Sequence, residues 1–223
     1  MIFNMVGASN GGGGGGGDVS DNDILLHFAD FNNSGKLNGV FYNINGYEIS
    51  SEQAKFGGTS LKVKSDPSTG GAVYFDSGFT LGNEDFTLDF WMYVTATASS
   101  NCAVSFNYRS LAGYVNSGTN IGWNFASSNG DWASSRVSNV QTILNAWHHW
   151  ALVRQGNTFY SFLDGALIDT FDWSGSFAPM TRLSFGTNSN SETAFRGYID
   201  EFRLKLGEAV WTSDFTPPTA PYE

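Results

Sequence analysis

The stretch Trp147–Thr170, WHHWALVRQGNTFYSFLDGALIDT, decides how the rest of the chain can fold. It contains three strand-like runs that are joined by two tight-turn signals, Gly156-Asn157 and Asp164-Gly165. Glycine takes a positive φ at no steric cost, and Asn and Asp take it at little cost, so both pairs suit the turns of β-hairpins. The sequence therefore predicts an antiparallel meander. Its three strands are 147–154, 158–163 and 166–171.

The first strand of this meander, residues 147–154, is apolar or aromatic on both of its alternating faces. This pattern is typical of a strand that is buried in the middle of a sandwich. A meander this apolar needs a second sheet to cover it, because a few strands alone cannot bury their apolar face.

Other strand-like runs are separated by clusters of Gly, Asp, Pro and Ser. In residues 86–94, the side chains of one face are apolar and those of the other are polar or aromatic. No long amphipathic helix is evident, and 16% of the residues are aromatic, which favours strands. The predicted fold class is all-β. The further predicted strands are 24–28, 60–63, 72–75, 86–94, 103–109, 121–125, 183–186 and 195–206.

Length and charge limit the function. The 223 residues fit one main domain with a sizeable core. Eleven basic and 21 acidic residues give a net charge of −10, which repels a phosphate backbone and an anionic bilayer, so nucleic acid and membranes are not expected partners. Cys102 is the single cysteine, so no intrachain disulfide can form.

The N-terminal part differs from the rest of the chain. Residues 11–17 are seven consecutive glycines, which predict a flexible linker, and Met1–Val6 before them is a short apolar peptide. This peptide is either a frayed end or an anchor that binds a larger assembly through residues 1–10. We expect a tether at 1–17 and a domain at 18–223. The start lacks the pattern of a Sec signal peptide, and no apolar run reaches the length of a membrane span.

Residues 30–35, DFNNSG, place oxygen side chains at the first, third and fifth positions, followed by glycine. This spacing can direct hard oxygen ligands at calcium. The twelfth position is Phe41, where an EF-hand has a bidentate Glu, so an ordinary Asx-rich turn is the alternative.

Several motifs together resemble the laminin-G-like domains of the concanavalin A-like lectin superfamily, over residues 24–222. The motifs are FGGTSL at 56–61, FTLDFW at 86–91, the meander at 147–168 and FRGYIDEFR at 195–203. The resemblance implies a jelly-roll sandwich of two antiparallel sheets, with the first and last strands close together and often a calcium ion near one rim.

For calcium, the resemblance and the acidic loop point to Asp30, Asn32 and Asp200. The chain departs from the family where Ala29 follows Phe28, because relatives commonly have His-Phe-Asp-Gly there. The ending FTPPTAP, residues 215–221, looks like that of domains on bacteriophage tail and capsid appendages.

Catalysis is not expected. Glycoside hydrolases of this fold need two carboxylates that face each other across a sugar bond, usually in a Glu-x-Asp-x-x-Glu strand. No such run exists here, and the adjacent Asp200 and Glu201 would point to opposite faces of a strand.

The tryptophans divide into two groups. Trp91, Trp147, Trp150 and Trp211 lie in the framework motifs of the resemblance, and we predict that they pack inside the domain. The candidate ligand surface surrounds the polar loop 127–131, and packing in the core is the alternative for its aromatic residues. The candidate residues are Tyr108, Arg109, Trp123 and Trp132.

The sequence thus predicts a non-catalytic carbohydrate-binding or adhesion module. With the resemblance to appendage domains, we expect it on a virion, in multiple copies, where it binds glycan on a host surface. The alternatives are a structural decoration protein that cements neighbours without binding glycan, and a hydrolase with unrecognised carboxylates.

Overall fold

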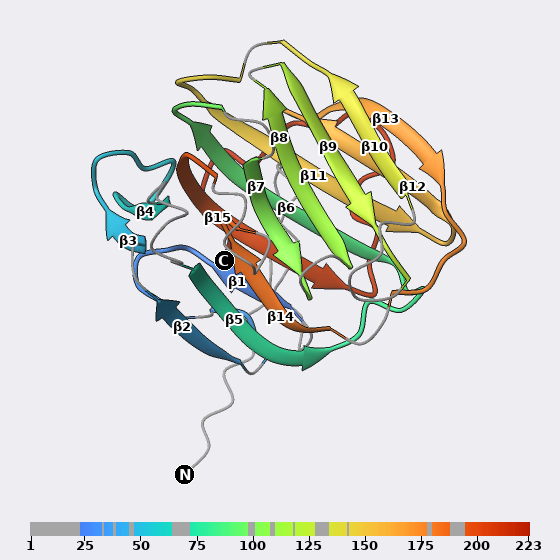
Figure 1. The fold of residues 1–223 in the computed structure, drawn as a ribbon, viewed down its shortest axis with the longest axis horizontal. Helices are drawn as coiled ribbons and strands as arrows, with labels where there is room; N and C mark the ends of the chain where they lie inside the picture. Colours follow the sequence, from blue (N-terminus) through green and yellow to red (C-terminus); the bar gives the residue numbers. More distant parts are fainter. Residues whose placement is uncertain are drawn as a thin grey trace, which may run out of the picture.

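The computed structural model describes residues 23–32, 34–37, 39–44, 47–63, 72–97, 101–107, 110–117, 119–127, 134–141, 143–177, 180–187 and 195–223. Within these ranges the regular structure is β-strand, as the all-β prediction requires (Figure 1). None of the described residues belongs to a helix long and apolar enough to cross a membrane.

The strands follow the chain in the order of the labels in Figure 1. They are β1 (Ile24–Leu26), β2 (Val40–Ile44), β3 (Tyr47–Ser50), β4 (Ser60–Val63), β5 (Ala72–Phe79), β6 (Phe86–Val94), β7 (Asn101–Phe106), β8 (Leu111–Ser117), β9 (Asn120–Phe125), β10 (Ser134–Asn139), β11 (Trp147–Gln155), β12 (Thr158–Leu163), β13 (Ala166–Asp172), β14 (Met180–Phe185) and β15 (Gly197–Leu206).

Two antiparallel sheets form the sandwich. Sheet A has the strand order β13-β12-β11-β6-β15-β4-β3, and β1 also pairs with β15. Sheet B has the order β10-β9-β8-β7-β14-β5-β2. The first and last strands are therefore hydrogen-bonded to each other, as the resemblance implies, and the jelly-roll fold class is confirmed.

The predicted meander is confirmed as β11, β12 and β13. Its turns use the residues that the sequence singled out, because Gly156, Asp164 and Gly165 have φ values of 59°, 52° and 80°. Gly165 has a second reason to be glycine. A Cβ atom there would lie 1.9 Å from the carbonyl oxygen of Phe215, so the C-terminal segment could not approach so closely.

The core lies between the sheets and is rich in aromatic rings. Trp150, Phe90 and Phe159 are completely buried there. Each such side chain stabilises the fold by about 1.5–3 kcal/mol relative to an exposed one. In β6, the buried face that the alternation predicted, Phe86 to Val94, points into this core.

Four strands were not predicted: β2, β3, β8 and β10. The strand β10 lies at the edge of sheet B, where half of its side chains are exposed, so it carries no apolar pattern. In β8, Gly113 interrupts the apolar run because a Cβ atom there would lie 2.8 Å from the ring of Trp123. The missing apolar pattern of β10 and the glycine in β8 both depend on neighbouring strands that the local sequence does not reveal.

Residues 208–223, the C-terminal strap, cross the outer face of sheet A, the face directed away from the core. Trp211 and Phe215 stack on each other, with ring centroids 3.9 Å apart. They pack with Phe162 and with small side chains of β11 in a second apolar cluster. The strap contains no strand or helix, as its prolines predicted.

Candidate ligand-binding surface

The predicted ligand surface is wrong in the one residue that can be placed. The side chain of Trp123 is 1% exposed, its ring centroid lies 4.3 Å from that of Trp150, and its indole N–H donates to Ser161. Trp123 is therefore a core residue, because it sits on the face of β9 that meets the other sheet. Tyr108, Arg109 and Trp132 lie outside the described residues.

The predicted calcium residues have other partners. Asp30 and Asn32 are exposed, and the Asn32 backbone N–H donates to the Asp30 carboxylate at 2.9 Å, as in an Asx turn. Asp200 is buried, and its carboxylate accepts the backbone N–H groups of Lys55, Phe56 and Glu201. In the described part of the chain, no three His, Cys, Asp or Glu side chains gather as a metal site would require. Calcium binding stays a prediction.

Burial raises the pKa of Asp200 to about 7, although the three backbone N–H groups act in the opposite direction. Its position has a structural use. By accepting the N–H groups of Lys55 and Phe56, this carboxylate holds the segment before β4 over the outer face of sheet A.

The feature that stands out is a line of side chains across this outer face. In β6 the even-numbered residues 86–94 point into the core, so the odd-numbered ones, including Tyr93, point outwards. The strand register places the other members level with Tyr93 on the neighbouring strands β11, β15, β4 and β3. This aromatic row consists of Trp147, Tyr93, Tyr198, Lys62 and Glu48.

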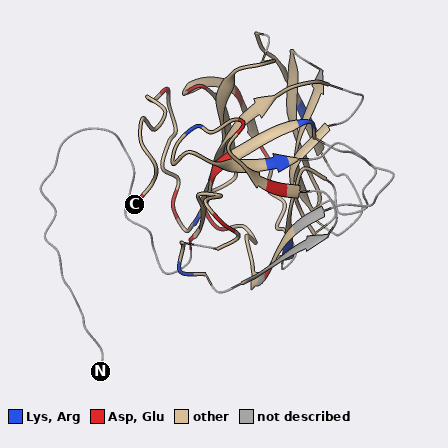
Figure 2. Cartoon of the chain, turned by 90° about the vertical axis from the view of Figure 1, so that its left-hand side faces the viewer, with Lys and Arg blue, Asp and Glu red and all other residues tan. Residues whose placement is uncertain are grey.

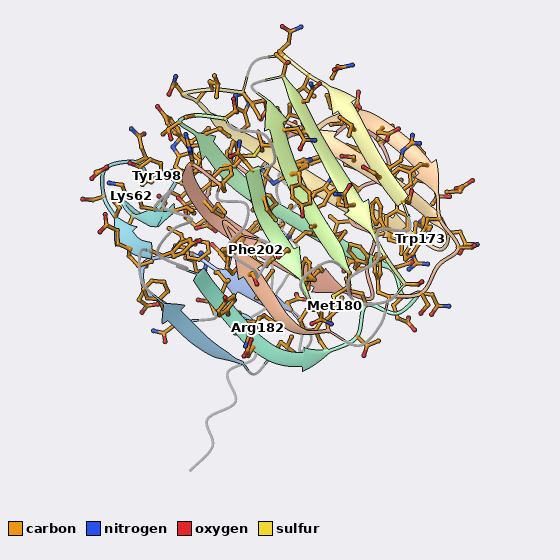
Figure 3. All side chains as sticks on the ribbon, in the orientation of Figure 1. Lys62, Trp173, Met180, Arg182, Tyr198 and Phe202 are labelled. Atoms are coloured by element: carbon orange, nitrogen blue, oxygen red, sulfur yellow. The ribbon has the colours of Figure 1, made fainter. Side chains whose placement is uncertain are left out.

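Tyr93 contacts both of the other rings in the aromatic row. Tyr93 lies in the middle, with its ring centroid 5.7 Å from that of Trp147 and 6.0 Å from that of Tyr198, both in edge-to-face geometry. Trp147 and Tyr93 are partly exposed to solvent, whereas Tyr198 is 7% exposed. Lys62 continues the line, with its ammonium 5.9 Å from the Tyr198 ring, and Figure 3 shows the two side by side.

The polar end of the row is a network of acids and one lysine. The Lys62 ammonium lies 2.6 Å from both carboxylate oxygens of Glu52 and 3.6 Å from Glu48. Tyr198 donates its hydroxyl to Glu52 at 2.7 Å. The hydrogen bond to Glu52 raises the pKa of Lys62. Figure 2, viewed from the side of β3 and β4, shows acidic and basic segments interspersed here.

A contact between a lysine and an aromatic ring lies two residues from Tyr93 along β6, on the same outer face. The Lys55 ammonium sits 3.7 Å from the ring centroid of Trp91, and Phe56 packs edge-on against the same ring. Burial lowers the pKa of Lys55, although the Asp164 carboxylate acts in the opposite direction. Trp91 is 6% exposed, so the prediction that it is a packing residue is confirmed.

Beyond Trp91, the C-terminal strap covers a buried ionic cluster centred on Asp89. Its carboxylate accepts Nε of Arg203 at 2.8 Å, pairs with Nε2 of His149 at 3.0 Å, and accepts the hydroxyl of Tyr222. Burial alone would raise the pKa of Asp89, but the Arg203 charge and these hydrogen bonds lower it. The Arg203 guanidinium also lies 4.0 Å from the Tyr222 ring. Asp89 is closed to solvent, so this cluster fastens the strap rather than offering a site.

Comparisons with known proteins agree with the fold. Residues 67–205 match the profile of the Concanavalin A-like lectin/glucanases superfamily, in its laminin G branch. The chain belongs to this superfamily. The laminin-G-like resemblance is thus confirmed for the fold. Comparison with curated protein sequences gives no match.

Solved structures with this fold include receptor-binding domains of botulinum neurotoxins. The type G receptor-binding domain has a TM-score of 0.64 at 11% identity, and covers 83% of this chain and 47% of its own. The binding domain of neurotoxin DC in complex with rat synaptotagmin II has a TM-score of 0.63 at 11% identity, and the match covers 83% of this chain and 48% of the neurotoxin chain. A third structure is of botulinum neurotoxin type C, whose cell entry is dependent upon interaction with two ganglioside molecules. It has a TM-score of 0.62 at 12% identity, and the match covers 83% of this chain and 47% of the neurotoxin chain. This chain spans about half the length of these proteins, and the likeness shows the fold alone.

The sequence analysis did not predict the aromatic row, although it placed Trp147 and Tyr93 in predicted strands. Trp147 was predicted to pack inside the domain, but it lies partly exposed on the outer face of sheet A. One signal was available, because the alternation in residues 86–94 already separated Tyr93 from the core face. The alignment with Tyr198 and Lys62 depends on β6, β15 and β4 being neighbours, which the sequence does not state.

Proposed function

We propose that this chain is a non-catalytic carbohydrate-binding module and that the aromatic row is its ligand surface. One observation carries the proposal: three aromatic residues stand level on neighbouring strands, beside carboxylates that a ligand can reach. Ring faces suit the C–H surface of a sugar ring, and carboxylates suit its hydroxyl groups. Tyr198, which is itself 7% exposed, links the aromatic and the acidic parts of the row, because its ring packs against Tyr93 and its hydroxyl bonds Glu52.

The structural neighbours support a binding role of this general kind. Cell entry of one neighbour, neurotoxin type C, is dependent upon interaction with two ganglioside molecules, and another neighbour is in complex with rat synaptotagmin II. The type G and DC neighbours are binding domains rather than catalytic ones. Three acidic residues of sheet A agree with that role, because Asp89, Asp200 and Glu201 are buried and bonded within the protein.

A shallow site of this type binds weakly, with roughly −4 to −5 kcal/mol, which corresponds to millimolar affinity. Several copies on one particle would raise the avidity by about 10² to 10⁴. We therefore propose that the module is displayed in multiple copies on a virion, where it binds host glycan through the aromatic row. The glycine run 11–17 supports this arrangement as a tether.

The test uses the full chain, once as a monomer and once clustered on a multivalent carrier, on a glycan array. Clustered protein should bind at least one glycan class, and the monomer should bind it poorly. The variant Trp147→Ala should lose binding and keep its circular dichroism spectrum, whereas Val137→Ala, an exposed apolar residue on β10 of the other sheet, should bind like the parent. A clustered protein that binds no glycan would favour the alternative, a structural decoration protein.

A further inference from the structure

The charges around the aromatic row distinguish between classes of glycan. We infer that its ligand is an uncharged oligosaccharide of several sugar rings that lies along the row, across the strands, and not a sugar acid. This inference rests on the proposed function and adds the class and orientation of the ligand.

Exposure decides which charge an approaching ligand meets first. The side chains of Glu52 and Glu48 are 60% and 41% exposed, whereas that of Lys62 is 26% exposed and already bonded to both. The nearby Lys55 ammonium is directed to the ring of Trp91. At the acidic end of the row, a sugar carboxylate would therefore face two exposed carboxylates and a Lys62 ammonium that already pairs with both. A neutral sugar would instead donate its hydroxyl protons to Glu52 and Glu48 in charge-assisted hydrogen bonds.

The row also fixes the size of the ligand. Adjacent strands lie about 4.8 Å apart, so two spacings separate Trp147 from Tyr198 by about 10 Å and four separate Trp147 from Glu48 by about 19 Å. One sugar ring cannot reach from the aromatic end to the acidic end. An extended chain of several rings can contact the aromatic rings at one end and the acids at the other.

The experiment is affinity electrophoresis of the full chain in native gels. One set contains neutral polysaccharides, namely β-glucan, galactomannan, xyloglucan and dextran, and the other contains polygalacturonate or polysialic acid. We expect retardation in at least one neutral gel and none in the acidic gels. A six-ring fragment of the retarding polysaccharide should compete at least tenfold better than its single sugar.

Two variants locate the effect. Trp147→Ala should weaken retardation at least tenfold, whereas Trp147→Phe should keep most of it. Glu52→Gln, an exposed change that does not threaten folding, should weaken retardation in the neutral gel and introduce retardation by polygalacturonate, because it removes the nearer of the two carboxylates that pair with the Lys62 ammonium.

The outcomes separate the two ideas. Retardation by acidic polysaccharides alone would overturn the ligand class and leave the proposed function standing. Equal competition by the single sugar, or neutral-gel retardation that neither Trp147→Ala nor Glu52→Gln changes, would overturn the placement along the row. Absence of retardation in every gel, together with absence of clustered binding on the glycan array, would overturn the proposed function itself.

Discussion

Replacing Asp89 by Asn should destabilise the protein far more than removing an equally well-formed ion pair at the surface. Asn keeps the shape of the side chain but removes the charge that compensates Arg203 inside the protein, where their side chains are 0% and 3% exposed. Breaking a buried pair by removing one partner typically costs about 3–5 kcal/mol, because the other charge stays buried without compensation. Domains of this size are stable by only about 5–15 kcal/mol, so the loss should be large.

The matched control is Asp169→Asn. Asp169 forms a bidentate pair with Arg136, at 3.0 and 2.9 Å, between β13 and β10. The Arg136 side chain is 42% exposed, and pairs of this kind contribute about 1 kcal/mol or less. Urea unfolding at pH 7, followed by tryptophan fluorescence, gives both free energies of unfolding. A loss below 1 kcal/mol for Asp89→Asn, or one equal to that of the control, would refute the reasoning.

The same pair predicts an acid limit. The folded-state pKa of Asp89 is lowered, because the Arg203 charge and the hydrogen bonds from His149 and Tyr222 outweigh burial. Its contribution is therefore present above the unfolded pKa, about 3.9, and is lost as the pH falls through the lower folded pKa. The parent should lose stability below about pH 4, and the curve of Asp89→Asn should be flatter there. If the free energies of unfolding of the parent and of Asp89→Asn fell in parallel with pH, Asp89 would not be the source of this loss.

Three other predictions concern the tryptophans, calcium and the N-terminal segment. Trp123→Ala should lower the free energy of unfolding by about 3–5 kcal/mol, because it leaves a cavity in the core. Trp147→Ala should change the melting temperature little. Similar melting curves for the two variants would contradict the assignment of Trp123 to the core. Calcium at a hundredfold excess over its dissociation constant should stabilise the protein by about 2.7 kcal/mol if Asp30, Asn32 and Asp200 bind it, and an unchanged melting curve with chelator would remove the site. Deleting residues 1–17 should leave a folded, soluble domain that no longer joins its assembly, so normal incorporation would argue against the anchor.

Local chemistry accounts for what the sequence could predict. The turns at Gly156 and Asp164-Gly165 need backbone conformations that few residues adopt, so their positions are visible in the chain itself. Alternation of polar and apolar residues likewise identified β6 with its observed bounds. The absence of an apolar signal in β10 has a different origin, because this edge strand meets sheet A through the ion pair of Arg136 with Asp169 rather than through apolar side chains.

The sequence by itself determined the fold class, the meander and the superfamily, because these follow from turns, alternation and motifs of neighbouring residues. Only the tertiary structure decided which tryptophan is buried and which can contact a ligand. Trp123 and Trp147 both lie in aromatic strands, but Trp123 points between the sheets and Trp147 points away from them. The aromatic row also depends on β11, β6, β15 and β4 lying side by side, although they are far apart along the chain. Burial and register are set by the whole sandwich, so no local pattern can specify them.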